Sequence, residues 1–162
     1  RDLMAETGWP GMKIMQFAFG SNSMNDNLPH TYTNSNMLVY GGTHDNETLV
    51  GYFENADEEE IAFACKYLNV ESVEEIPSAI IRSAYASTAD VAIMQMQDIL
   101  GLDNSARMNL PSSVGQNWRW RLAPGQFTDE HIDYLRELAE TYGRELDKPE
   151  IEEEDEEEDT EE

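Results

Sequence analysis

MLVYGGTHDN, residues 37–46, is the stretch that decides the fold class. Its first four side chains are apolar, two glycines end the run, and a polar segment follows at once. A short, continuously apolar segment of this kind is typical of a strand that is buried on both faces of a parallel sheet. The stretch therefore predicts an α/β protein in which residues 43–46 follow the carboxyl end of a buried strand.

Two further apolar runs, residues 12–19 and 91–96, predict two more buried strands. Each is followed by a long polar segment, residues 20–36 and 102–126, and long loops in compact domains are often functional. Three strands cannot close a barrel, and so small a sheet leaves unpaired edges and an open apolar face. The order of elements therefore indicates either about five further βα units upstream or a small open sheet.

Helices are predicted to begin near Asn46, at Asp57, around Pro77 and at Thr128. Asp57 and Glu60 have the spacing of a capping box, Pro77 suits the first turn of a helix, and Thr128 is a good N-cap. Phe127 and Ile132 are spaced as a hydrophobic staple around that last start. The side chains expected to face the core lie at helical spacing: Ile61, Ala64, Cys65, Leu68; Ile80, Ile81, Ala84, Tyr85; and Ile132, Leu135, Leu138, Ala139, Tyr142.

The charge of the chain is strongly negative and unevenly distributed. The formal net charge is −24, and residues 150–162 hold 11 of the 34 acidic residues and no base. We expect this run to be disordered, because like charges repel and few apolar residues are available for burial. So acidic a chain argues against nucleic-acid and anionic-membrane partners, which need a basic face, and favours a neutral substrate.

Other features of the sequence bear on its cellular setting. No apolar run approaches the roughly 18 residues of a membrane span. The single Cys65 excludes an intrachain disulfide and is expected to be a buried free thiol, which fits a reducing cytoplasm. The sequence starts at Arg1 without an initiator Met or a signal-peptide pattern, which suggests the interior of a longer chain.

Residues 42–48 (GTHDNET) resemble the motif around the third catalytic carboxylate of the family-77 4-α-glucanotransferases, or amylomaltases. Other segments resemble the same family in the same order and cover roughly residues 1–143. They are 10–13 with 16–19, which resemble its sixth strand; 28–32, the loop after that strand; and 97–98, 106–109 and 117–122, which resemble the segment after its eighth strand.

The resemblance implies the fold and the domain organisation. Residues 1–146 are expected to form the C-terminal βα units, about strands six to eight, of a (β/α)8 TIM barrel. Residues 147–162 are expected to form the disordered acidic tail. The upstream portion of the barrel is then the expected partner of this chain.

The resemblance also implies the chemistry. The family moves α-1,4-glucan segments to a glucose or malto-oligosaccharide acceptor by retaining double displacement, and needs no cofactor. The resemblance assigns to Asp45 the stabilisation of an oxocarbenium-like transition state. The nucleophilic Asp and the acid/base Glu follow strands four and five of the family, upstream of Arg1, so we expect a cytoplasmic enzyme portion that is inactive alone. The alternatives are a non-catalytic glucan-binding or interaction module, and an acidic interaction protein that acts through its tail.

Five other side chains are candidates for contacts with the glucan. His44 is adjacent to Asp45 and suits donation to a hydroxyl of the same sugar, and the Asn109 amide suits sugar hydroxyls. Asp98 either does the same or caps the following turn. His30 and Tyr32, in the loop after the first predicted strand, are candidates for lining the glucan groove.

Two neighbouring features have competing interpretations. Trp118 and Trp120 either stack on a sugar face or pack in the core, and the alternation with Arg119 and Arg121 favours packing. Asp45 without the resemblance is an ordinary helix cap. No metal site is expected, because no further ligands accompany His44 and Asp45 at a suitable spacing.

Overall fold

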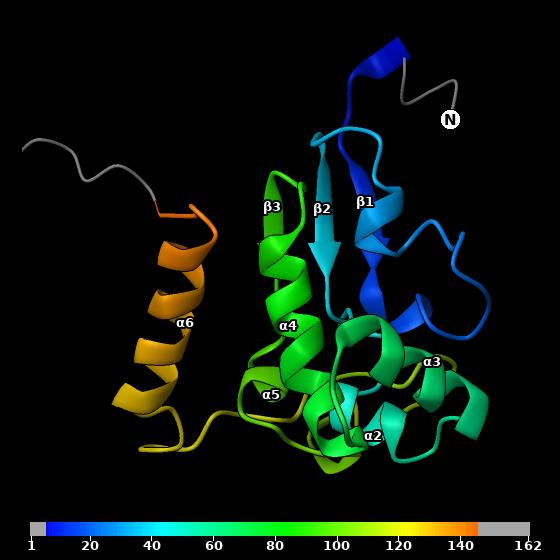
Figure 1. Ribbon diagram of the computed structural model, residues 1–162. Helices are drawn as coiled ribbons and strands as arrows, with labels where there is room; N and C mark the ends of the chain where they lie inside the picture. Colours follow the sequence, from blue (N-terminus) through cyan, green and yellow to red (C-terminus); the bar gives the residue numbers. More distant parts are fainter. Residues whose placement is uncertain (1–5, 146–162) are drawn as a thin grey trace, which may run out of the picture.

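The computed structural model describes residues 6–145, which form a three-stranded parallel sheet with helices packed on one face (Figure 1). The predicted α/β class is confirmed. The strands are hydrogen-bonded in chain order: β1 (Gly11–Ile14), β2 (Met37–Tyr40) and β3 (Val91–Ile93). The helices are α2 (Leu49–Phe53), α3 (Glu58–Leu68) and α4 (Ile76–Ala86) between β2 and β3, then α5 (Met96–Ile99) and α6 (Asp129–Thr141). Short 3-10 helices lie in the connections: η1 (Met15–Phe17), η2 (Pro29–Thr31), η3 (Val73–Glu75) and η4 (Asn104–Ala106).

One face of the sheet is covered by the helices and the other is open, as the burial of aligned residues shows. Val39 aligns with Lys13 and Ala92, and its side chain is fully buried in the core beneath the helices. One residue earlier, Leu38 aligns with Met12 and Val91, which are 59% and 44% exposed. Successive side chains of a strand point to opposite faces, so this apolar row lies on the face away from the core. The expectation that all three strands are buried on both faces is therefore wrong for β1 and β3 in this chain.

Two strands are shorter than predicted. In residues 12–19 the ladder ends at Ile14, and η1 follows, closed by the Ala18 N–H, which donates to the Met15 carbonyl at 2.9 Å. The apolar residues beyond it, such as Phe19, are buried in the core without belonging to a strand. In residues 91–96, β3 ends at Ile93 and Met96 begins α5. Apolar runs thus indicated burial correctly and overestimated strand length.

Local hydrogen bonds set the helix starts. α2 begins at Leu49 instead of near Asn46, because the Thr48 hydroxyl accepts the Gly51 N–H at 3.1 Å. α3 begins after Asp57 as predicted, but no capping box forms there, since Glu60 accepts the Tyr52 hydroxyl at 2.8 Å. Pro77 lies in the first turn of α4 as predicted. The stripes predicted within residues 61–68 and 80–85 pack in or against the core, with the Cys65 thiol free and half-buried.

The last helix packs less completely than its sequence suggested. Thr128 precedes α6 as predicted, but Phe127 stacks on His131, with ring centroids 5.6 Å apart, and Ile132 is 40% exposed. The predicted staple between Phe127 and Ile132 stays a prediction. Of the predicted stripe, Leu138 is buried in the core. A cavity of about 440 Å³ is lined by residues of α2 and α4 together with Tyr134 of α6.

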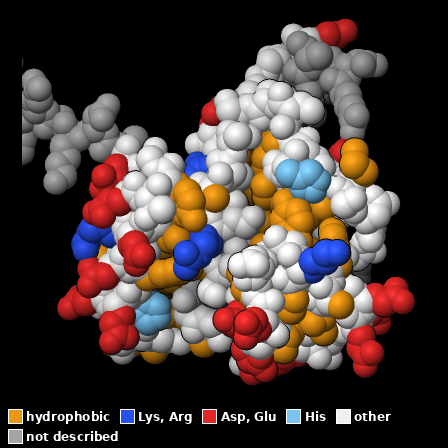
Figure 2. Space-filling view, viewed as in Figure 1, with side chains coloured by type: hydrophobic (Ala, Val, Ile, Leu, Met, Phe, Trp, Pro, Cys, Tyr) orange, Lys and Arg blue, Asp and Glu red, His pale blue; other side chains and the backbone are white. Residues whose placement is uncertain are grey.

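The surface carries the negative charge seen in the sequence. On the face drawn in Figure 2, acidic side chains gather over α6 and along the lower edge of the view, whereas Lys and Arg side chains are scattered. The predicted acidic tail, residues 147–162, lies outside the described residues. Within residues 6–145, no helix combines the length and the apolar character that a bilayer crossing requires.

Candidate functional site

The segments that follow the three strands converge at Gly41 and Gly42. The Gly41 carbonyl accepts the Gln16 N–H that follows β1. A Cβ at Gly41 would lie 3.3 Å from the Met94 sulfur, and one at Gly42 would lie 3.3 Å from Gln95 Nε2, both in the segment after β3. Two residues without side chains therefore allow the carboxyl ends of the strands to meet, with the polar run 43–46 at that edge.

Residues 43–46 form a turn in which Thr43 and Asn46 bond to each other. The Thr43 N–H and hydroxyl donate to Asn46 Oδ1 at 2.9 and 2.7 Å, and the Asn46 N–H donates to the Thr43 carbonyl at 3.0 Å. The Asp45 side chain takes no part in this turn and is 51% exposed. The following helix is capped by Thr48. Asp45 is therefore not a helix cap, the ordinary interpretation that its sequence left open.

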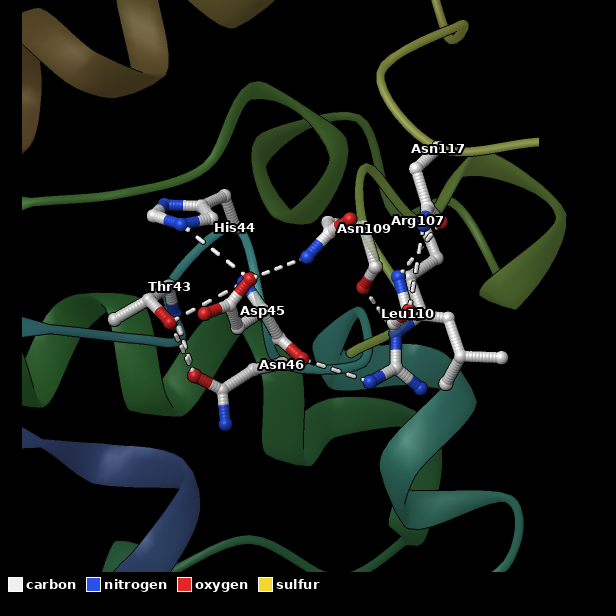
Figure 3. A network of polar contacts seen from close by, with 8 residues as sticks. All are labelled: Thr43, His44, Asp45, Asn46, Arg107, Asn109, Leu110 and Asn117. Carbon is white, nitrogen blue, oxygen red and sulfur yellow. Dashed lines mark hydrogen bonds and ion pairs between the residues drawn. The ribbon is translucent and has the colours of Figure 1, made fainter. Parts of the chain in front are cut away.

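The Asp45 carboxylate is held by two side chains that share one oxygen (Figure 3). Asn109 Nδ2 donates to Asp45 Oδ1 at 2.6 Å, and His44 Nε2 lies 3.3 Å from the same oxygen. Two of the predicted site residues thus contact Asp45. His44 is its neighbour in the chain, whereas Asn109 comes from a segment more than sixty residues away. Both contacts are to Oδ1, and the half-exposed carboxylate remains accessible to a ligand.

Trp118 lies beside this group and is not packed in the core. Its side chain is 54% exposed, and its ring centroid is 5.0 Å from that of His44. Its backbone has φ 63°, a left-handed conformation that bulky residues rarely adopt. The packing interpretation that the sequence favoured is wrong for Trp118, while Trp120 is half-buried.

Arg107 is a site residue that the sequence interpretation did not single out. Its Nη2 donates to the Asp45 carbonyl at 2.7 Å, and its Nε donates to the Asn109 carbonyl at 2.9 Å. Its Nη1 lies 3.9 Å from Glu47 Oε1, and Glu47 in turn accepts a hydrogen bond from the Asn104 amide. The available signal was a rare cation in an acidic chain, two residues before the candidate Asn109.

Asp98 lies beneath the site and serves a different purpose. Its side chain is 3% exposed, and Oδ1 accepts the Leu49 N–H, at the start of α2, at 2.7 Å. Burial raises the pKa of this carboxyl to about 6, against the opposing effect of the Leu49 hydrogen bond. The geometry favours the capping interpretation, although the helix capped is α2 and not the turn after Asp98.

His30 and Tyr32 are not brought to Asp45. His30 bonds through Nδ1 to the Tyr67 hydroxyl at 3.0 Å and through Nε2 to the Ser23 carbonyl at 2.8 Å. The Tyr32 hydroxyl donates to the Asn27 carbonyl at 3.0 Å, and its ring lines a hollow near Gly11 and Met37, where β1 and β2 begin. Burial raises the pKa of Tyr32 above its usual range. A role for these two residues in glucan binding stays a prediction.

The chemistry of the site is that of one accessible carboxylate flanked by an amide, an imidazole and an indole. No cluster of three or more His, Cys, Asp or Glu side chains suited to a metal ion occurs among residues 6–145. Hydrogen-bonding groups beside an exposed aromatic ring suit a neutral polyhydroxyl ligand such as a sugar.

Comparison with known proteins shows a consistent similarity. The family profile described as 4-alpha-glucanotransferase matches residues 1–128. The chain is 44% identical over 146 residues to the chloroplastic/amyloplastic 4-alpha-glucanotransferase of Arabidopsis thaliana, covering 88% of this chain and 25% of that protein. It is 43% identical over 144 residues to the 4-alpha-glucanotransferase of a Synechocystis species, covering 89% and 28%.

A solved structure agrees. The amylomaltase of Streptococcus agalactiae in complex with acarbose superposes with a TM-score of 0.82 at 40% identity, over 90% of this chain and 29% of that one. The three-stranded sheet thus matches part of an amylomaltase. The chain spans about a quarter of the length of the curated relatives it matches.

Proposed function

Because the chain belongs to the 4-alpha-glucanotransferase family, we propose that it forms part of an enzyme that transfers α-1,4-glucan segments to glucose or a malto-oligosaccharide. One observation carries the proposal. A half-exposed carboxylate, Asp45, lies where the segments after three parallel strands converge, and Asn109 orients it at 2.6 Å. The carboxyl edge of the strands is where α/β barrels bind substrate. The relative in complex with acarbose, a carbohydrate analogue, is consistent with this ligand class.

Asp45 is proposed to act on the transition state. When a retaining enzyme breaks a glycosidic bond, positive charge develops over the ring oxygen and the anomeric carbon. A fixed carboxylate that accepts hydrogen bonds from ring hydroxyls stabilises that charge more than it stabilises the neutral ground state. The Asn109 bond leaves Asp45 Oδ2 for this contact, and His44 is placed to bond a hydroxyl of the same sugar.

Two further groups are needed for the complete reaction. A nucleophilic carboxylate attacks the anomeric carbon while an acid protonates the leaving oxygen, and an acceptor hydroxyl then displaces the covalent glucosyl intermediate. We assign both groups to a portion of the enzyme outside these 162 residues. In the same proposal, residues 1–146 supply about strands six to eight of a TIM barrel in a cytoplasmic enzyme, and residues 147–162 form its acidic tail. The open row Met12–Leu38–Val91 supports the barrel, because an apolar face of this kind is suited to enclosure.

Disproportionation of maltotriose tests the proposal directly. The enzyme that contains these residues should convert maltotriose into glucose and longer malto-oligosaccharides, resolved by chromatography. Release of glucose without longer products would show that water, and not a sugar, is the acceptor. The 162-residue chain alone should give neither set of products, because Asp45 cannot act as nucleophile and acid as well. Transfer by this chain would overturn the assignment of both missing groups.

The second candidate is a non-catalytic glucan-binding module. The exposed Trp118 ring beside His44 favours it, since an aromatic face and polar groups are sufficient to bind a sugar without cutting it. Binding of maltotriose to the 162-residue chain, measured by calorimetry and lost in Trp118→Ala, supports a module that functions alone. Activity of the longer enzyme that is lost in Asp45→Asn supports the transferase.

A further inference from the structure

Arg107 contacts both residues of the Asn109–Asp45 hydrogen bond, and it does so through their backbones. The guanidinium donates to the Asp45 carbonyl from Nη2 at 2.7 Å and to the Asn109 carbonyl from Nε at 2.9 Å. The two residues are joined a second time by their side chains, Nδ2 to Oδ1, at 2.6 Å. The three residues thus form a closed ring of hydrogen bonds between the segment after β2 and the segment after η4 (Figure 3).

The geometry needs an arginine and not merely a positive charge. A guanidinium holds its N–H donors in a rigid plane, so two acceptors bonded to it are held at a fixed spacing. A lysine ammonium is a point charge on a flexible stem and fixes no such spacing. The Arg107 side chain is 21% exposed, and Glu47, bonded to Asn104, flanks its Nη1 at 3.9 Å. The Arg107 guanidinium is therefore itself held in place.

We propose that Arg107 is a positioning residue that fixes the distance between the segments carrying Asn109 and Asp45, and so presses the amide against the carboxylate. The carboxylate is then held in one orientation at the edge of the sheet, with Oδ2 directed to the ligand. The expected effect on catalysis rests on the proposed transferase function, whereas the expected effect on the contact between the Asn109 amide and the Asp45 carboxylate does not. The titratable and charged groups near Asp45 are His44 and Arg107, with Glu47 on the far side of the guanidinium.

The juxtaposition is tested on the 162-residue chain by the ¹H–¹⁵N signal of the Asn109 side-chain amide at neutral pH, identified by its loss in Asn109→Ala. A charge-assisted hydrogen bond is short and moves the donor proton downfield. Asp45→Asn should therefore move this proton upfield. In an Arg107→Lys background, the same substitution should move it by less than half as much, while amide signals of α3 and α6 stay in place. An equal shift in the two backgrounds would overturn the proposal. Arg136→Lys, at an exposed ion pair with Asp133, is the matched control and should leave the shift unchanged.

The catalytic consequence is tested in the enzyme that contains these residues. Arg107→Lys should lower kcat for maltotriose about 10- to 100-fold with KM changed less than about threefold, because misplacement by about 1 Å costs up to about a hundredfold. In an Asn109→Ala background the same substitution should cost less than about threefold, since residues that act through each other are not additive. Equal losses in both backgrounds would show that Arg107 acts independently of Asn109. An inactive wild-type enzyme would refute the proposed function, and the amide signal would then decide the positioning role alone.

Discussion

Asp45 differs from two other aspartates of the chain in what its carboxylate bonds. Asp98 accepts the Leu49 backbone N–H and Asp103 accepts the Ser105 backbone N–H, so both fix local structure. Asp45 is bonded by the side chains of His44 and Asn109, while its turn is closed by Thr43 and Asn46. A side chain that the fold does not need for its own hydrogen bonds is available for a ligand.

The first prediction concerns that carboxylate. Asp45→Asn should leave the fold intact, because the turn does not depend on the side chain, and should lower turnover of the complete enzyme. Loss of one electrostatic stabiliser costs on the order of 10² to 10³ in kcat. Steady-state kinetics with maltotriose, together with circular dichroism, measure the two effects. Near-normal turnover in a folded variant would remove Asp45 from the active site.

The second prediction concerns the buried Asp98 and the pH dependence of stability. Burial raises the pKa of this carboxyl from 3.8 to about 6, so the folded state binds its proton more tightly than the unfolded state does. The resulting stability is fully present below pH 3.8 and is lost as the pH rises through about 6. Two pKa units correspond to about 3 kcal/mol.

Asp98→Asn removes this titration and keeps an oxygen that accepts the Leu49 N–H. The difference in unfolding free energy between the wild-type chain and the variant should therefore change by about 2 kcal/mol between pH 4.5 and 7, with the wild type losing stability. Urea unfolding at a series of pH values measures it. Asp133→Asn, on the exposed face of α6, is the control and should give a nearly constant difference. A constant difference for Asp98→Asn as well would mean that the carboxyl is ionised throughout the range.

At the scale of elements, α2 connects the site to the core. The helix is five residues long, and its start is held by the buried Thr48 hydroxyl and by the Asp98 carboxylate. The backbone N–H of Thr48 also donates to Asn104 at 3.3 Å, in the segment that leads to Arg107. The start of α2 is therefore linked to both segments of the site, the one that carries Asp45 and the one that carries Arg107.

The third prediction tests this capping. Thr48→Ala removes the acceptor for the Gly51 N–H and should cost about 1–2 kcal/mol of unfolding free energy, the usual effect of losing an N-cap. Thr48→Ser keeps the hydroxyl and should cost less than half as much. Denaturant unfolding of both variants separates the cap from the packing of the methyl group. If the serine variant loses as much as the alanine variant, the methyl group and not the hydroxyl stabilises α2.

Element patterns in the sequence were informative where burial decides structure and weaker where single hydrogen bonds do. The apolar run 37–40 gave β2, and Pro77 and Thr128 marked two helix starts. Several residues between 43 and 48 could cap α2, and the sequence does not show which of them does. In the structure Thr43 and Asn46 bond to each other, and Thr48 is the cap. The pairing of Asn109 with Asp45 joins segments far apart in sequence, and the sequence predicted Asn109 only as a glucan contact and not as a partner of Asp45.

At the scale of the whole molecule, the described chain is a sheet with one face open. The helices bury Val39 and its neighbours, while Met12, Val91 and Ile93 remain 39–59% exposed on two of the strands. The sequence predicts this open face for a small sheet that stands alone, since three short strands cannot enclose their own apolar side chains. It did not anticipate the incomplete packing of α6, because a helical stripe shows which face is apolar and not how much partner surface is available.

The last prediction uses the open face to separate a chain that functions alone from a portion of a barrel. In the 162-residue chain, Val91→Lys places a charge on an exposed strand, so it should reduce self-association and binding of a hydrophobic dye without lowering the unfolding midpoint. In an enzyme whose further βα units enclose this face, the same lysine is buried without a partner and should cost several kcal/mol. Ile132→Lys, at an exposed apolar residue of α6, is the matched control and should be tolerated in both proteins. Analytical ultracentrifugation and thermal unfolding of both proteins provide the comparison. If the longer enzyme tolerates Val91→Lys as well as the short chain does, the face is not enclosed, and the barrel arrangement that places Asp45 at a rim is wrong.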